Sequence, residues 1–173
     1  MWSVLIALVF MIGTVFSSNG QVNATATTTA TIVTPIMISK TVDMNFGNIA
    51  VGSIGGTVVL SPAGSRTKTG DIVLTATAGT VTSASFTVTG MADYAYNITL
   101  PTTNVIITKA TGSETMIVNS FVSTPSANGI LSAEFTNPAS QIINVGATLI
   151  ISPNQTAGVY VSNTPFAVTV NYN

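Results

Sequence analysis

The sequence predicts an all-β protein built as a sandwich or a barrel, and three observations support this prediction. Short runs of alternating apolar and polar residues recur along the chain between turn residues, and strand side chains point to opposite faces with period two. The chain is rich in Thr, Val and Ile, which suit a pleated sheet, and poor in the usual helix formers Glu, Lys, Arg and Gln. No long stretch beyond the N-terminus has a helical pattern, so we expect roughly ten to twelve short strands.

The N-terminus has the features of a signal peptide, which predicts a secreted protein. An apolar run extends from Val4 to Phe16, 13 residues (16 − 4 + 1), whereas a membrane-spanning helix needs about 20. Ser18 and Gly20 fit the small-x-small cleavage pattern, so residues 1–20 are the expected signal peptide and Gln21 begins the mature chain. The first residues carry no Lys or Arg, and an uncleaved N-terminal anchor is the alternative.

Residues 21–34 are expected to form an N-terminal arm that is separable from a sandwich domain at residues 35–173. The letters QVNATATTTATIV alternate, and the apolar side chains that share one face are Val22, Ala24, Ala26, Ala30 and Ile32. A free strand of this kind can add to the edge of a sheet in a neighbouring subunit. We therefore expect this arm to act as a donor strand.

The last residues, TPFAVTVNYN, alternate as clearly as the arm does. Phe166, Val168, Val170 and Tyr172 share one face, and we expect this face to point into the core with Tyr172 closing the row. An alternating apolar edge at the end of a chain is also a segment that an assembly partner can pair with.

Between the termini, further alternating runs predict the remaining strands. They cover residues 41–49, 56–61, 70–77, 84–90, 94–100, 104–108, 115–122, 129–135, 141–152 and 158–162. Tyr94 and Tyr96 are expected on one inward face, with Ile98 and Leu100.

Glycines mark the special backbone positions between these runs. Gly47 indicates a bulge or a close approach of two backbones. Arg66 and Lys68 are expected in a hairpin loop framed by Gly64 and Gly70, with their charges on its solvent-facing tip.

Composition excludes several classes of function. The chain has no His and no Cys, which removes imidazole and thiol catalysis, and its charged fraction is 5%, against about 25% in ordinary proteins. The acidic residues are scattered without a motif for catalysis or calcium binding: Asp43, Asp71, Asp93, Glu114 and Glu134. A net charge of −1 argues against nucleic acid. We therefore expect no enzyme, cofactor, metal or small-molecule substrate.

Several segments, in order along the chain, resemble a family of secreted bacterial proteins known as a domain of unknown function, whose members look like fimbrial major subunits and spore-coat-U-type pilin domains. The matching segments are MNFGNIAVG, SPAGSRTKTGDIVL, ASFTVTG, YNITLP, NVGATL, QTAGVY and FAVTVNYN. The resemblance implies an immunoglobulin-like, pilin-like β-sandwich and, in relatives that assemble, donor-strand exchange with a periplasmic chaperone and an outer-membrane usher. Pilins carry a Gly some residues before a penultimate aromatic, and Gly158 and Tyr172 match that pattern, although the chain lacks the cysteine pair of many fimbrial subunits.

Together these observations predict a structural subunit of a bacterial surface fibre or coat, which forms a homopolymer after export through the periplasm. The alternative is a monomeric secreted β-sandwich that binds glycan or extracellular matrix and pairs its N-terminal strand within its own sheet. The arm distinguishes the two, because a polymer subunit needs it free, whereas a binding module would pair it and expose a concave aromatic surface elsewhere.

Overall fold

A computed structural model describes residues 20–132 and 139–173. Residues Val33–Asn173 form one compact unit, and the described residues before it, 20–32, belong to a separate unit. The predicted signal peptide lies outside the described residues except for Gly20. Among the residues that the structure describes, there is no helix long and apolar enough to cross a membrane.

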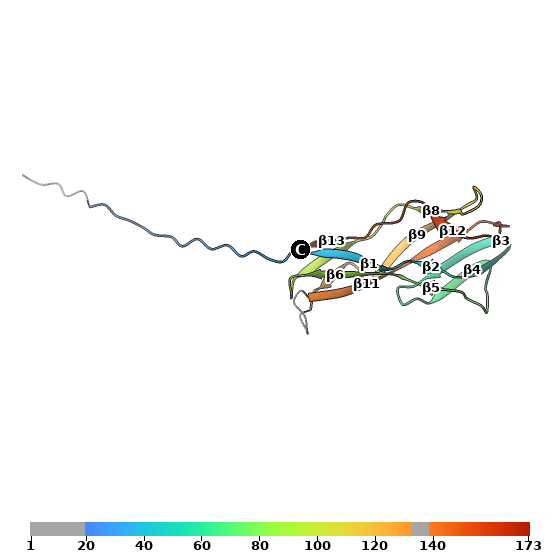
Figure 1. The fold of residues 1–173 in the computed structure, drawn as a ribbon, viewed down its shortest axis with the longest axis horizontal. Helices are drawn as coiled ribbons and strands as arrows, with labels where there is room; N and C mark the ends of the chain where they lie inside the picture. The colour runs from blue at the N-terminus through green and yellow to red at the C-terminus, as the bar shows by residue number, and fades with distance from the viewer. Residues whose placement is uncertain (1–19, 133–138) are drawn as a thin grey trace, which may run out of the picture. The chain divides into compact units, whose positions relative to one another are not determined.

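The compact unit is all-β, as the sequence predicts, and is consistent with a β-sandwich (Figure 1). Its described residues form thirteen strands: β1 (Met37–Val42), β2 (Asn45–Phe46), β3 (Ile49–Leu60), β4 (Arg66–Leu74), β5 (Val81–Thr82), β6 (Ala84–Gly90), β7 (Ala95–Thr99), β8 (Val105–Lys109), β9 (Thr115–Thr124), β10 (Asn128–Ile130), β11 (Ala139–Ile151), β12 (Tyr160–Ser162) and β13 (Thr169–Tyr172). No helix occurs among the described residues. Every strand pair is antiparallel.

The strands form three sheets. The largest has eight strands in the order β1-β6-β11-β9-β8-β12, with β3 pairing both β11 and β4. A second sheet has the order β10-β7-β13, and β2 pairs β5 in a third. The long strand β11 organises the large sheet, because its first half pairs β6, its second half pairs β3, and its other edge pairs β9.

The core is divided into two apolar clusters along the large sheet. The first cluster lies between β6, β11 and the three-stranded sheet, and its buried residues include Phe86, Val88, Tyr96, Ile143 and Val170. The second cluster lies over the other half of the large sheet, and its buried residues are Val58, Ile72, Val118, Ala147, Leu149 and Ile151. Because alternate residues of β11 face the same layer, one strand contributes to both clusters.

The structure corrects the predicted loop around Arg66 and Lys68. The turn is only residues 61–65, closed by Ser61 and Ser65, so both basic residues lie on β4 and Arg66 stands opposite Leu60. Strand β3 also extends back through the glycine-rich run to Ile49, with a register shift between Val51 and Gly56. A Cβ at Gly70, whose φ is +68°, would collide with the backbone at Gly55. The glycines therefore permit a close approach of β3 and β4 instead of a loop.

Two other strand predictions are longer than the strands observed. Only Thr169–Tyr172 of the expected strand at residues 165–172 pairs with a neighbour, and residues 165–168 lie in no strand. The expected strand at 129–135 appears as β10, which ends at Ile130, and its residues from 133 lie outside the described part of the chain, as does Glu134. Tyr94 precedes β7 and is half exposed, so it does not share the buried face of Tyr96.

Candidate functional site

An open apolar groove of about 1260 Å³ lies over the second core cluster. Its floor is the large sheet, where Val118, Leu149 and Ile151 are buried and Ile107 and Met116 are partly buried. Over the first core cluster, the three-stranded sheet β10-β7-β13 covers the corresponding face of the large sheet. The groove therefore lies where the second layer of the sandwich is incomplete.

One wall of the groove is the segment from the end of β1 through β2 to the start of β3. Val42, Met44 and Phe46 line it. The guanidinium Nη1 of Arg66 donates to the carbonyl oxygen of Phe46 at 2.5 Å, which ties this wall to β4.

Gly47 holds the same wall close to the strand beside it. Its φ is +69°, and a Cβ there would collide with the carbonyl oxygen of Ala78 and the side chain of Val81. The side-chain oxygen of Asn45 accepts the Gly47 N–H at 2.8 Å. The predicted close approach at Gly47 is therefore confirmed, and it fixes where this wall stands.

The opposite wall runs from Gln155 through β12 to Phe166. The Tyr160 hydroxyl donates to the carbonyl oxygen of Thr156 at 2.7 Å and accepts from Gln155 Nε2 at 2.8 Å. Phe166 packs between Phe121 and Phe86, with ring centroids 4.9 and 6.2 Å away. These contacts shape both ends of the wall.

Both walls contain strand edges without a pairing partner among the described strands. Strand β1 pairs only β6, and β12 pairs only β8. Residues 163–168 lie in no strand, although their sequence alternates. Unpaired edges beside an apolar floor are a template for an added strand.

The arm complements the groove, because it is an alternating segment that no described strand pairs with. Residues 20–36 lie in neither helix nor strand, and none of the described strands pairs with them. The side chains of Val22 and Ile32 are 93% and 95% exposed, and Ala24, Ala26 and Ala30 are exposed as well. A strand is defined by its hydrogen-bonded partner, so an alternating segment without one remains irregular in the single chain.

The C-terminal residues predicted to act together are distributed over three places. Val168 and Val170 are buried in the first cluster, as predicted. Gly158 and Phe166 line the groove. Tyr172 packs against the first cluster, and its hydroxyl donates to the carbonyl oxygen of Thr34 at 2.8 Å.

Four of the charged residues form two ion pairs. Lys40 and Asp43 approach to 2.6 Å on the surface, and Lys109 lies 3.6 Å from Glu114. A backbone hydrogen bond at Glu114 lowers the pKa of its carboxyl, and the nearby Lys109 lowers it further. Within the described ranges, no three acidic, His or Cys side chains gather in a metal-binding arrangement.

The four tyrosines do not form one platform. Tyr96 is fully buried, and burial raises the pKa of its hydroxyl. Tyr94 and Tyr172 pack edge to face, with centroids 5.4 Å apart, and Tyr160 lies separately on β12.

A smaller cavity of about 600 Å³ lies between residues 100–108 and 163–167, and Thr, Asn and Pro residues with Phe166 line most of it.

Sequence reasoning missed the groove itself. The runs at residues 104–108 and 115–122 give the floor residues Ile107 and Met116, which look like ordinary core positions in the sequence. Period-two alternation shows which face is apolar but not whether a second layer covers it. Only the structure shows that residues 165–168 belong to no strand.

The fold and the groove together define a class of protein: an all-β sandwich whose second layer leaves an apolar groove uncovered. Residues 36–172 match the model of a domain of unknown function, DUF4402, and the chain belongs to this family. No curated protein and no solved structure matches the chain.

Proposed function

We propose that the protein is a non-catalytic structural subunit of a bacterial surface fibre or coat, in which the arm of one subunit fills the groove of the next. The observation that carries this proposal is a complementary pair within one chain. The arm is an alternating segment without a partner, and the groove is an apolar slot with unpaired edges. One supplies the strand that the other lacks.

The size of the groove supports a strand as its occupant. Small-molecule pockets usually measure about 300–1,000 Å³, and the groove measures about 1260 Å³. A strand added there gains main-chain hydrogen bonds along the walls and buries alternate side chains on the floor.

The arm's side chains indicate how the occupied groove would be held. Full burial of Val22 or Ile32 would contribute about 1.5–3 kcal/mol each, and the alanines between them much less. Main-chain pairing over about ten residues therefore has to supply a large part of the binding. The contact is head-to-tail, so it propagates into a filament instead of closing as a dimer.

The cellular setting follows from the predicted signal peptide and from the resemblance to fimbrial and spore-coat-U-type subunits. Export would bring the chain to the periplasm, where the open groove would need protection. A periplasmic chaperone could pair with the groove walls, and an outer-membrane usher could guide polymer growth. The edge strand β13, with β7 as its single partner among the described strands, supports a role for the C-terminal strand in this step.

Charge on the inward face of the arm provides the test. Ala26→Asp should abolish fibre formation, since an unpaired carboxylate would be buried against the apolar floor. Thr27→Asp, one residue along on the outward face, should assemble to within a few-fold of wild type. Negative-stain microscopy and sedimentation of the purified mature proteins would measure assembly.

Both variants should fold as monomers, because both positions are exposed in the single chain. Equal fibre formation by the two variants, or normal assembly after deletion of residues 21–33, would contradict the proposal. The alternative function, a monomeric module that binds glycan or matrix, would then take its place. The smaller cavity beside Phe166 would be the first surface to test for it.

A further inference from the structure

The chain enters the sandwich through residues 33–36, here called the root, and the penultimate residue holds this root in place. The Tyr172 hydroxyl donates to the carbonyl oxygen of Thr34 at 2.8 Å and accepts the Met91 N–H at 2.6 Å. Ile36 packs against the first apolar cluster. The root, the end of β6 and the end of β13 therefore meet at one hydroxyl group.

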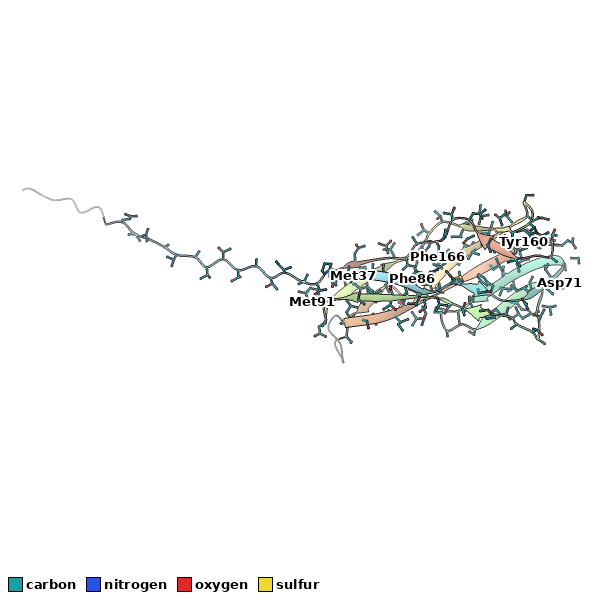
Figure 2. The ribbon with its side chains drawn as sticks, in the orientation of Figure 1. Met37, Asp71, Phe86, Met91, Tyr160 and Phe166 are labelled. Atoms are coloured by element: carbon teal, nitrogen blue, oxygen red, sulfur yellow. The ribbon has the colours of Figure 1, made fainter. Side chains whose placement is uncertain are left out.

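The root lies beyond one end of the groove. Strand β1 begins at Met37 opposite Thr89, whereas the groove meets β1 at Lys40 and Val42 and β6 at Phe86 and Ala84. Met37 to Lys40 spans about 10 Å at the usual rise of a strand. Figure 2 shows Met37 and Met91 at one end of the sandwich and Tyr160 toward the other.

Length alone does not decide which groove the arm fills. The arm at residues 21–33 has 13 residues (33 − 21 + 1) and would extend over about 40 Å. An arm that reversed its direction at the root could therefore reach the groove of its own chain. Some other feature must favour the groove of a neighbour.

Tyr172 opposes this reversal because its hydroxyl binds the carbonyl oxygen of Thr34. In a β-turn the carbonyl of the first residue accepts from the N–H three residues later, and Pro favours the second position. A turn with Pro35 in that position would use the Thr34 carbonyl, which Tyr172 already holds against β13 and Met91.

We propose that Tyr172 is a positioning residue, which holds the root so that a second copy's arm fills the groove in preference to the chain's own arm. This inference rests on the proposed function, since it requires that the arm binds the groove. The chain's own arm is the competing occupant.

Cross-linking of introduced thiols tests this preference, and the chain has no native cysteines to interfere. The mature protein would carry Ala26→Cys in the arm and Met44→Cys in the groove wall, joined by a short bis-maleimide. Denaturing gels would separate intermolecular ladders from internally linked monomers. The same pair would be made with Tyr172→Phe and, as a matched control, with Tyr94→Phe, which leaves the bonds to Thr34 and Met91 intact. A pair with exposed Ser140→Cys would report background linking.

Intermolecular links should dominate in the parent and in Tyr94→Phe. In Tyr172→Phe both hydrogen bonds of the hydroxyl are lost, and the ratio of internal to intermolecular links should rise about threefold to tenfold, as loss of the one bond that holds Thr34 implies. An unchanged ratio in Tyr172→Phe, or mainly internal links in the parent, would overturn the inference while leaving the groove as the binding site of the arm. Links no more frequent than with Ser140→Cys would overturn the proposed function itself.

A second variant keeps the inference testable if Tyr172→Phe does not fold. Insertion of Gly-Ser-Gly after Ile32 lengthens the connection to the root and changes no residue of the compact unit. Internal links should increase here too, and no increase would contradict a role for the held root.

Discussion

Tyr96 shows how one buried side chain combines packing with a polar contact. Its ring is fully buried in the first cluster, and its hydroxyl donates to Gln141 Oε1 on β11 at 2.6 Å. The bond joins the three-stranded sheet to the large sheet. Burial also disfavours the phenolate, so the pKa of the hydroxyl is raised above its ordinary 10.0.

Tyr96→Phe should lower the free energy of unfolding by about 1 kcal/mol at neutral pH, because one buried hydrogen bond is lost. The wild type should also lose stability as the pH rises above 10, since the folded tyrosine keeps a proton that the unfolded chain releases. The Phe variant should lose less over the same range. Urea unfolding between pH 7 and 11 would measure both effects, and equal pH slopes for the two proteins would refute the assignment to Tyr96.

Strand β11 shows what alternation in the sequence predicts well. Ile142 and Ile143 are neighbours, yet the first is 58% exposed and the second fully buried. The period-two pattern specifies this difference, because one face meets the core along the whole strand.

Ile143→Ala should destabilise the sandwich by about 2–5 kcal/mol through lost burial and a residual cavity. Ile142→Ala should change stability by less than about 1 kcal/mol, since its side chain already contacts water. Thermal or urea unfolding of both variants would provide the comparison. Similar losses of stability at the two positions would contradict this orientation of Ile142 and Ile143.

The same elements show where sequence patterns stop being informative. Alternation located Val168 and Val170 in the core, because their burial follows from which face is apolar. It did not place Arg66 on β4, because the five-residue turn at 61–65 and the close contact at Gly70 depend on how two strands pair. It missed the groove for a similar reason, since a missing second layer is a property of the tertiary arrangement.

At the scale of the whole molecule, the compact unit and the arm make separable contributions. The arm's apolar side chains are exposed in the single chain, so deleting residues 21–33 should leave the unfolding temperature of the sandwich almost unchanged. The open groove should then be able to bind the missing strand as a separate peptide.

A synthetic peptide of residues 21–33 should raise the unfolding temperature of the arm-deleted protein in a concentration-dependent way. Binding to the folded state alone adds about 2.7 kcal/mol when the free peptide is a hundredfold above its dissociation constant. Differential scanning fluorimetry would record the shift. A peptide with Ala26→Asp is the control and should have little effect, whereas equal shifts from both peptides would show that binding does not use the inward face.

The cluster of three phenylalanines has a mechanical consequence for the proposed fibre. Phe166 contacts Phe86 and Phe121, and Phe121 packs against both apolar clusters. Tension applied to an arm would enter its own subunit through the backbone of the root and pass into β1, while the Tyr172 hydroxyl ties the root to β13. It would reach the next arm through the groove walls, which contain Val42 and Phe166. A strand pulled along its length loads all of its hydrogen bonds in shear at once. Each subunit would therefore carry force along its paired strands and across its hydrophobic interior.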